Sequence, residues 1–223
     1  MFCDNQIILF TLYFKVLLIM SNEDYLKDLS EIKNLMNKSS RFISLSGLSG
    51  ILAGIYALIG AATAYRLVIN YSDGILYIFH GWVFWTCMAV LLMVALLSAV
   101  TGIILTTKKA KQNGEKIWDN SSKRLLLNFL IPLVVGGIYC FIILNQGRYG
   151  QTGGLMLIFY GLALVSASKY SLGDIKYLGY LEIALGLVAS YYPSYGFWFW
   201  VIGFGIMHII YGTWMHFKYD AKN

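Results

Sequence analysis

The stretch YLGYLEIALGLVASYYPSYGFWFWVIGFGIMHIIYGTWMHF, residues 177–217, decides the fold of this 223-residue chain. Its single Asp, Glu, Lys or Arg side chain is Glu182. A helix needs about 20 apolar residues to cross a hydrocarbon core of about 30 Å, so the stretch is long enough for two crossings. Pro193 lies near its middle in SYYPSYG, a sequence typical of a turn. The stretch therefore predicts two transmembrane helices joined at Pro193.

Four further runs contain no acidic or basic side chain, and they predict four more crossings: residues 42–65, 74–107, 125–147 and 149–168. The composition agrees, since 58% of the residues are hydrophobic and 13% are charged, about half the charged fraction of soluble domains. We expect an all-α polytopic membrane bundle of six transmembrane helices. Their expected positions, within about four residues, are 42–66, 78–106, 123–145, 152–169, 174–192 and 196–217.

The basic residues predict the orientation of these helices. Lysines and arginines gather before the first predicted helix, between the second and third, between the fourth and fifth, and after the sixth. Only Arg66 and Arg148 fall on the opposite side of the bundle. The positive-inside rule then places both termini in the cytoplasm. The net charge of +6 is thus a topology signal, and nucleic acid is not an expected partner because no basic face lies on a soluble domain.

The chain outside the bundle divides into three segments. Residues 1–19 fit neither a signal peptide nor a full span, and we interpret them as a non-native upstream extension or a short apolar segment. Residues 20–41 contain an expected cytoplasmic amphipathic helix at 21–38, with apolar residues at helical spacing. The six-helix domain follows at 42–217, and residues 218–223 form a short cytoplasmic tail.

The first predicted helix carries small residues at intervals of four, Ser46, Gly50 and Gly54. Such a stripe lets two helices approach closely in lipid, so we expect this face to pack against another helix. The string Gly47-Leu48-Ser49-Gly50 also resembles the serine motif of the rhomboid intramembrane proteases. That resemblance implies a nucleophilic Ser49 paired with His208, although in the rhomboid family the serine lies on the fourth helix of the core.

Glu182 and His208 are ionisable residues that lie deep within the last two predicted helices, away from their ends. A charged group inside the bilayer costs about 2.5–3.5 kcal/mol on insertion scales, so it usually faces the bundle and has a partner. Counted from the flanking Asp174 and Lys218, the two residues lie about 12 and 15 Å deep. We therefore expect an intramembrane pair, either structural or protonatable, with Ser49 at a similar depth as a further polar neighbour.

Three strings resemble an uncharacterised family of bacterial six-helix inner-membrane proteins: SSRFISLSGLSGILAGIYALIGA (39–61), SSKRLLLNFLIPLVVGGI (121–138) and GFGIMHIIYG (203–212). The resemblance extends from about residue 20 to the C-terminus, and it implies a bacterial inner (cytoplasmic) membrane location without an activity. The nucleotide-binding, dinucleotide-binding and metal-binding motifs are absent from the sequence, so we expect no cofactor, no metal and no catalytic residue.

Three functions remain open at this point. A regulatory or structural membrane protein is favoured, with the lipid bilayer around it and a cytoplasmic protein partner docked on residues 21–38 or 107–124. A small proton-coupled transporter or permease using Glu182 and His208 is the main alternative, and an intramembrane serine hydrolase using Ser49 and His208 is the third. A homo-oligomer is compatible with each of them. A polar cavity reaching Glu182 would indicate transport, whereas a closed bundle would indicate a structural role.

Overall fold

The computed structural model describes residues 25–27, 29, 46–71, 81–114, 118–171 and 173–220. The expected extension at 1–19 lies outside these residues, and so does most of the expected helix at 21–38, of which residues 25–27 and 29 are helical and exposed. The chain divides into two units, 1–41 and 42–223, and the site described below belongs to the second unit alone. Within the described residues the structure is all-α, without strands.

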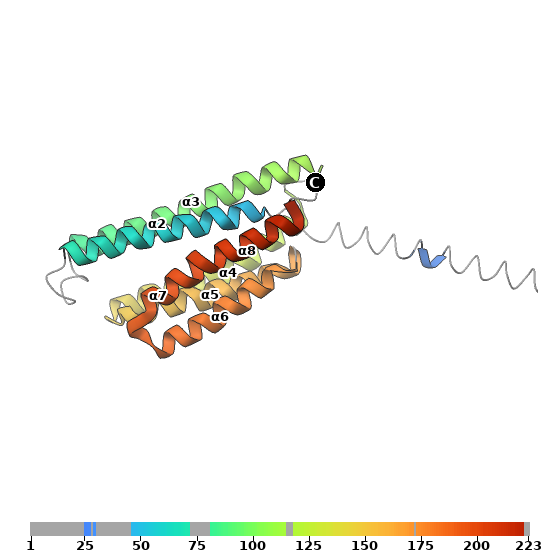
Figure 1. Cartoon of the computed structure of the whole chain (residues 1–223). Coiled ribbons are helices and arrows are strands. Elements are labelled where there is room, and N and C mark those ends of the chain that lie inside the picture. The colour runs from blue at the N-terminus through green and yellow to red at the C-terminus, as the bar shows by residue number, and fades with distance from the viewer. Residues whose placement is uncertain are drawn as a thin grey trace, which may run out of the picture. The chain divides into compact units, whose positions relative to one another are not determined.

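The second unit is built from long apolar helices, shown in Figure 1. In chain order they are α2 (Gly47–Tyr71), α3 (Trp82–Gln112), α4 (Asn120–Asn145), α5 (Thr152–Ala167), α6 (Ile175–Tyr191), α7 (Gly196–Trp200), the π-helical segment η5 (Val201–Met207) and α8 (His208–Met215). Short 3-10 segments flank α5 and precede α7: η2 (Tyr149–Gln151), η3 (Ser168–Tyr170) and η4 (Pro193–Tyr195). A second π-helical segment, η6 (His216–Asp220), follows α8.

Five of the described helices are long and apolar enough to cross a membrane, which is compatible with a multi-pass membrane protein. Their bounds, with the flanking short segments merged in, are Gly47–Tyr71, Trp82–Gln112, Asn120–Asn145, Tyr149–Tyr170 and Pro193–Asp220. The predicted count of six is not confirmed, because α6 has only 17 residues. A crossing helix typically needs about 20 residues.

The predicted helix boundaries differ from the structure at a few ends. The first helix ends at Tyr71, five residues beyond the expected 66, and the second continues to Gln112 instead of 106. The loop expected at 107–124 is therefore shorter, because its first lysines lie on the last turns of α3. The expected tail at 218–223 begins with helix, since η6 continues to Asp220. The break at Pro193 is confirmed: α6 ends at Tyr191 and α7 begins at Gly196.

The helices form two groups joined by the last helical segments. α2 packs along α3, while α5 packs against both α4 and α6. The segment η5–α8 packs against α2, and α7 packs against α5 and α6, so the C-terminal helix lies between the two groups (Figure 1). α3 and α4 follow each other in the chain, yet they are not among the closely packed pairs of helices.

Two carboxylates tie the helices together at one end of the bundle. Asp220 accepts hydrogen bonds from the backbone N–H of Gly47 at 2.9 Å and from Nζ of Lys109 at 2.5 Å. Asp174, just before α6, accepts from Nζ of Lys218 and from the hydroxyl of Tyr219, both at 2.6 Å. These bonds hold the pKa of the Asp174 carboxyl below its usual range, with the Lys218 bond contributing most.

Candidate functional site

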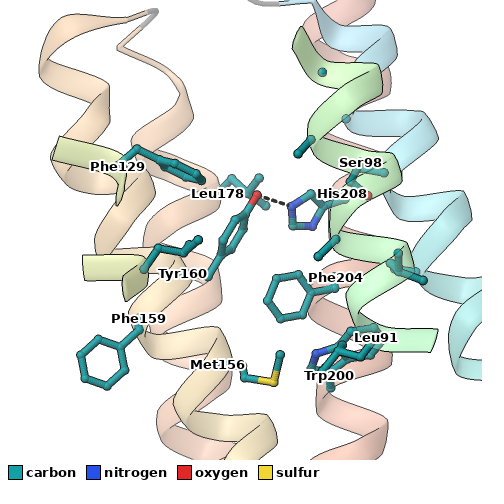
Figure 2. Close-up of a pocket in the computed structure, with 18 of the residues that line it drawn as sticks. Leu91, Ser98, Phe129, Met156, Phe159, Tyr160, Leu178, Trp200, Phe204 and His208 are labelled. Atoms are coloured by element: carbon teal, nitrogen blue, oxygen red, sulfur yellow. Dashed lines mark hydrogen bonds between the residues drawn. The ribbon is translucent and has the colours of Figure 1, made fainter. Parts of the chain in front are cut away.

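Three polar side chains from three helices meet inside the bundle. Tyr160 on α5 places its hydroxyl 2.8 Å from Nε2 of His208, the first residue of α8. On the other side of the imidazole ring, Nδ1 lies 3.5 Å from Oε1 of Glu182 on α6. Glu182 is fully buried and His208 is 6% exposed. Figure 2 shows the phenol of Tyr160 and the imidazole of His208 reaching toward each other from different helices.

Glycines bring α5 and α6 close enough to place Tyr160 and Glu182 side by side. A Cβ on Gly161 would lie 2.6 Å from the carbonyl oxygen of Gly179, and a Cβ on Gly179 would lie 2.8 Å from that of Gly161. Gly154 and Gly186 repeat this reciprocal contact one heptad further on. Backbones in lipid approach this closely only where small residues face each other.

Gly203 makes room for the Glu182 carboxyl and also binds the imidazole. A Cβ at Gly203 would lie 2.6 Å from Oε2 of Glu182 and closer still to Cδ2 of Leu157, so a larger residue at this position would require both side chains to shift. The carbonyl oxygen of Gly203 lies 3.0 Å from Nδ1 of His208. Gly203 belongs to the π-helical segment η5, and π-helical turns are frequent at functional sites because they re-aim side chains.

These contacts determine where the protons of the Tyr160–His208 pair lie. A backbone carbonyl can only accept a hydrogen bond, so Nδ1 of His208 carries a proton and donates it to Gly203. In the neutral imidazole Nε2 is then the acceptor, and the Tyr160 hydroxyl donates to it. The Tyr160 oxygen keeps free lone pairs, because a phenol both donates and accepts. Neither carboxyl oxygen of Glu182 has a hydrogen-bond partner by the usual criteria.

A cavity of about 710 Å³ lies against this polar cluster. Helices α2, α3, α4, α5, α6, α7 and α8 all contribute to its wall, and Tyr160 and His208 line it whereas Glu182 does not. Its volume falls in the range of about 300–1,000 Å³ that is usual for small-molecule sites. The cavity is therefore large enough to hold a small molecule.

One wall of the cavity is an aromatic row on the C-terminal helix. Trp200, Phe204 and His208 follow at intervals of four, with ring centroids 5.1 Å apart for the first pair and 5.8 Å for the second. The Tyr160 ring lies 5.0 Å from Phe204 and 5.3 Å from His208. Figure 2 shows Trp200 and Phe204 below His208 in this view. Among the described residues that line the cavity there is no Asp, Glu, Lys or Arg.

The opposite walls come from α3 and α4, where small residues alternate with large apolar ones. The small residues are Ala95, Ser98, Ala99 and Gly102 on α3, and Gly136, Gly137 and Cys140 on α4. A Cβ added at Gly102 or Gly137 would meet nothing within 4 Å. α3 and α4 therefore both line the cavity although they are not a closely packed pair.

The small-residue stripe of the first predicted helix lies on the wall of α2 that faces the C-terminal helix. A Cβ on Gly50 would lie 3.2 Å from Cα of Gly212, and one on Gly54 would lie 2.7 Å from the carbonyl oxygen of Gly205. Ser46 precedes α2 and lines the cavity with Gly50. The role of the stripe in helix association stays a prediction.

Ser49 lines the same cavity, but the structure does not pair it with His208. Its hydroxyl donates to the carbonyl oxygen of Ser46 at 2.6 Å. Both nitrogens of His208 are already bonded, to Tyr160 and to Gly203. No arrangement of Ser49 and His208 as nucleophile and base is present, since that chemistry needs the two within hydrogen-bond reach.

Sequence reasoning missed Tyr160 and the cavity. Tyr160 lies in FYGLAL, an uncharged run in which a tyrosine resembles any other aromatic residue of a membrane helix. Its neighbour Gly161 was the available signal, because Gly154 and Gly161 are spaced by seven and face the matching Gly179 and Gly186. The cavity exists because α3 and α4 are not a closely packed pair, and the sequence of neither helix alone predicts this spacing.

Comparisons with known proteins assign no family. No protein-family model matches the chain, and no curated protein or solved structure is significantly similar to it. Within the described residues no group of three or more His, Cys, Asp or Glu side chains could hold a metal ion.

Proposed function

We propose that this chain is a multi-pass membrane protein that binds an amphiphile dissolved in the bilayer, in the cavity between α3 and α4. The observation that carries the proposal is a cavity of about 710 Å³ that is lined by α3 and α4, two helices that are not a closely packed pair, and that has no Asp, Glu, Lys or Arg in its described wall. An apolar chain gains free energy by filling such a space through dispersion contacts that an empty cavity lacks.

The same proposal includes the membrane topology. Six spans require α6 as the additional crossing, and its 17 residues rise about 25 Å, close to the thickness of the hydrocarbon core. The distribution of lysine and arginine supports cytoplasmic termini, and the sequence resemblance supports a bacterial inner membrane. Exposed large apolar side chains on α3 and α4, such as Leu96 and Phe141, would contact lipid.

A regulatory role fits this binding site better than a catalytic one. Ser49 is bonded to the backbone of Ser46 and not to His208, and the His208 ring is held between the Tyr160 hydroxyl and the Gly203 carbonyl. Occupation of the cavity would change how α3 and α4 sit, and the connection between them carries the cytoplasmic segment 107–124 proposed to bind a protein partner. A ligand favours one arrangement of α3 and α4 over another only if it binds the two arrangements with different affinity.

Proton-coupled transport is the second candidate, favoured by the buried Glu182 facing His208 at 3.5 Å. Buried ionisable groups in membrane helices commonly belong to proton relays. We rank it below ligand binding because Glu182 itself does not line the cavity. From the sequence, a transporter is expected to have a polar cavity at Glu182, and a structural protein is expected to have a closed bundle. Among the described residues, the cavity beside Glu182 and His208 has no acidic or basic side chain other than His208 in its wall, and this supports ligand binding instead.

Photo-crosslinking tests the proposal. The protein in liposomes is mixed with a 16-carbon alcohol that carries a diazirine midway along the chain, and the adducts are located by peptide mass spectrometry. We expect adducts on the cavity faces of α3 and α4, including the peptide around Cys140, which lines the cavity.

Gly137→Leu fills the cavity from α4, since a Cβ there meets nothing within 4 Å, and it should reduce the adducts on cavity residues. Val135→Leu is the matched control, because Val135 is 52% exposed and does not line the cavity. Adducts spread evenly over the outer surface, unchanged by Gly137→Leu, would contradict the proposal.

A further inference from the structure

The cavity wall also carries information about the head group of the proposed amphiphile. The inference rests on the proposed function, and it concerns the chemistry that Tyr160 and its neighbours offer to a molecule in the cavity. Two independent features bear on it: the charge of the wall, and the direction of the hydrogen bonds at its polar end.

The wall has no side chain to neutralise an ionised head group. Of the described lining residues, none is Asp, Glu, Lys or Arg, and His208 is the only histidine. The His208 proton is already donated to the carbonyl oxygen of Gly203. Moving a phosphate or carboxylate from water into such a site without a counter-charge is strongly unfavourable. The head group is therefore uncharged.

The polar end of the cavity offers an acceptor. The Tyr160 hydroxyl gives its proton to Nε2 of His208, so its oxygen has lone pairs but no second proton for a ligand. Tyr160 is only half-buried, because it lines the cavity. A head group that donates a hydrogen bond completes the arrangement at Tyr160, whereas one that can only accept finds no donor there. Trp200 and Tyr211 also line the cavity, and their Nε1 and hydroxyl have no partner among the described residues, so a hydroxyl head group, which both donates and accepts, suits this wall better than an ether or a ketone.

We propose that the cavity takes a long-chain neutral alcohol, whose hydroxyl donates to the Tyr160 oxygen while its chain fills the space between α3 and α4. Gly203 and His208 are positioning residues in this arrangement. The Gly203 carbonyl places the imidazole proton on Nδ1, and Nε2 of His208 in turn directs the Tyr160 proton away from the ligand.

Competition with the photoreactive alcohol tests this inference. The competitors share a saturated 16-carbon chain and differ in the head: hexadecanol, hexadecyl methyl ether, 2-hexadecanone and hexadecanoic acid. A hydrogen bond with a net value near 1 kcal/mol corresponds to a roughly three- to tenfold difference in affinity. We expect hexadecanol to prevent cavity labelling at roughly three- to tenfold lower concentration than the ether or ketone, with the acid weakest.

Tyr160→Phe removes the phenol oxygen and keeps the ring, but it leaves Nε2 of His208 as an acceptor on the cavity wall. It is therefore combined with His208→Phe, and in this double variant the alcohol and the ether should become equal competitors while cavity labelling persists. Tyr139→Phe is the matched control on α4, because Tyr139 is 43% exposed and does not line the cavity. It should leave the preference for the alcohol intact.

The outcomes separate the two proposals. Labelling of the cavity with equal competition by alcohol and ether in the unmodified protein overturns the inference alone. So does a preference for the acid, or a preference for the alcohol that survives the Tyr160→Phe, His208→Phe double variant. Absence of cavity labelling by the probe overturns the proposed function, and the head-group inference with it.

Discussion

Replacing Glu182 by methionine should stabilise the protein. Glu182 is fully buried, and its carboxyl oxygens have no hydrogen-bond partner. Its nearest polar neighbour is Nδ1 of His208 at 3.5 Å, whose proton is also used by the carbonyl oxygen of Gly203 at 3.0 Å. Burying a polar group without hydrogen bonds costs about 1–3 kcal/mol in protein mutational series. Methionine is similar in length to glutamate and removes this cost.

Glu182→Met is expected to stabilise the protein and not to destabilise it, because the substitution leaves no new unpaired polar group. His208 keeps its bonds to Gly203 and Tyr160 when the carboxyl is removed. Exchanging buried ionic groups for apolar ones of similar volume is often neutral or stabilising by about 1–4 kcal/mol. After subtracting the lost attraction to the imidazole, we expect a gain of about 1–2 kcal/mol, which raises Tm by about 2–8 °C in a chain of this size.

The assay is thermal denaturation in lipid nanodiscs at one scan rate, followed by tryptophan fluorescence, because membrane-protein unfolding is often irreversible and the apparent Tm depends on scan rate. Glu182→Gln keeps the size of the side chain and should unfold within about 0.5 kcal/mol of the unmodified protein, the usual range for an undisruptive change. A drop in Tm of several degrees for Glu182→Met would refute the reasoning, because it would show that the Glu182–His208 pair is a net source of stability.

Three further predictions concern packing and the end of the bundle. Gly203→Ala should destabilise the protein by about 1–3 kcal/mol, because its Cβ overlaps the space of the Glu182 carboxyl, while Gly102→Ala, with nothing within 4 Å, should cost nothing in the same melting assay. Gly161→Ala should destabilise similarly, since its Cβ lies 2.6 Å from a carbonyl oxygen of α6; an unchanged Tm would show that α5 and α6 are not in close contact. The pKa of Asp174 is lowered by its bond from Lys218, so its contribution is present at neutral pH and is lost as pH falls below about 4. Asp174→Asn should therefore lower stability by about 0.2–1 kcal/mol at pH 7 and by less near pH 3. If the stability difference between the variant and the unmodified protein were the same at both pH values, the Asp174–Lys218 ion pair would be contradicted.

Much of the fold follows from the sequence because long uncharged runs have few alternatives. Without water, the backbone must satisfy its own hydrogen bonds, so such runs predict helices. The turn at Pro193 was predictable for a similar reason, since the ring of proline removes a backbone donor. Helix ends were harder to place: α3 continues through Lys108, Lys109 and Lys111 because lysines near a helix C-terminus are favourable.

The candidate site was only partly predictable. Glu182 and His208 stand out because ionisable residues are rare in apolar runs, and depth counted from Asp174 and Lys218 placed them at one level. Tyr160 could not be selected in this way, because tyrosines occur throughout the chain. The cavity depends on α3 and α4 not being a closely packed pair. Their small-residue faces predict close packing, so the local pattern pointed away from the observed arrangement.

The central claim, that the gap between α3 and α4 admits a membrane amphiphile, is tested most directly by an experimental density map of the protein in a nanodisc containing hexadecanol. We predict elongated non-protein density that enters between the faces carrying Gly102 and Gly137 and ends within hydrogen-bond distance of the Tyr160 oxygen. A map in which these two faces are packed directly against each other, with no room for a chain between them, would contradict the account.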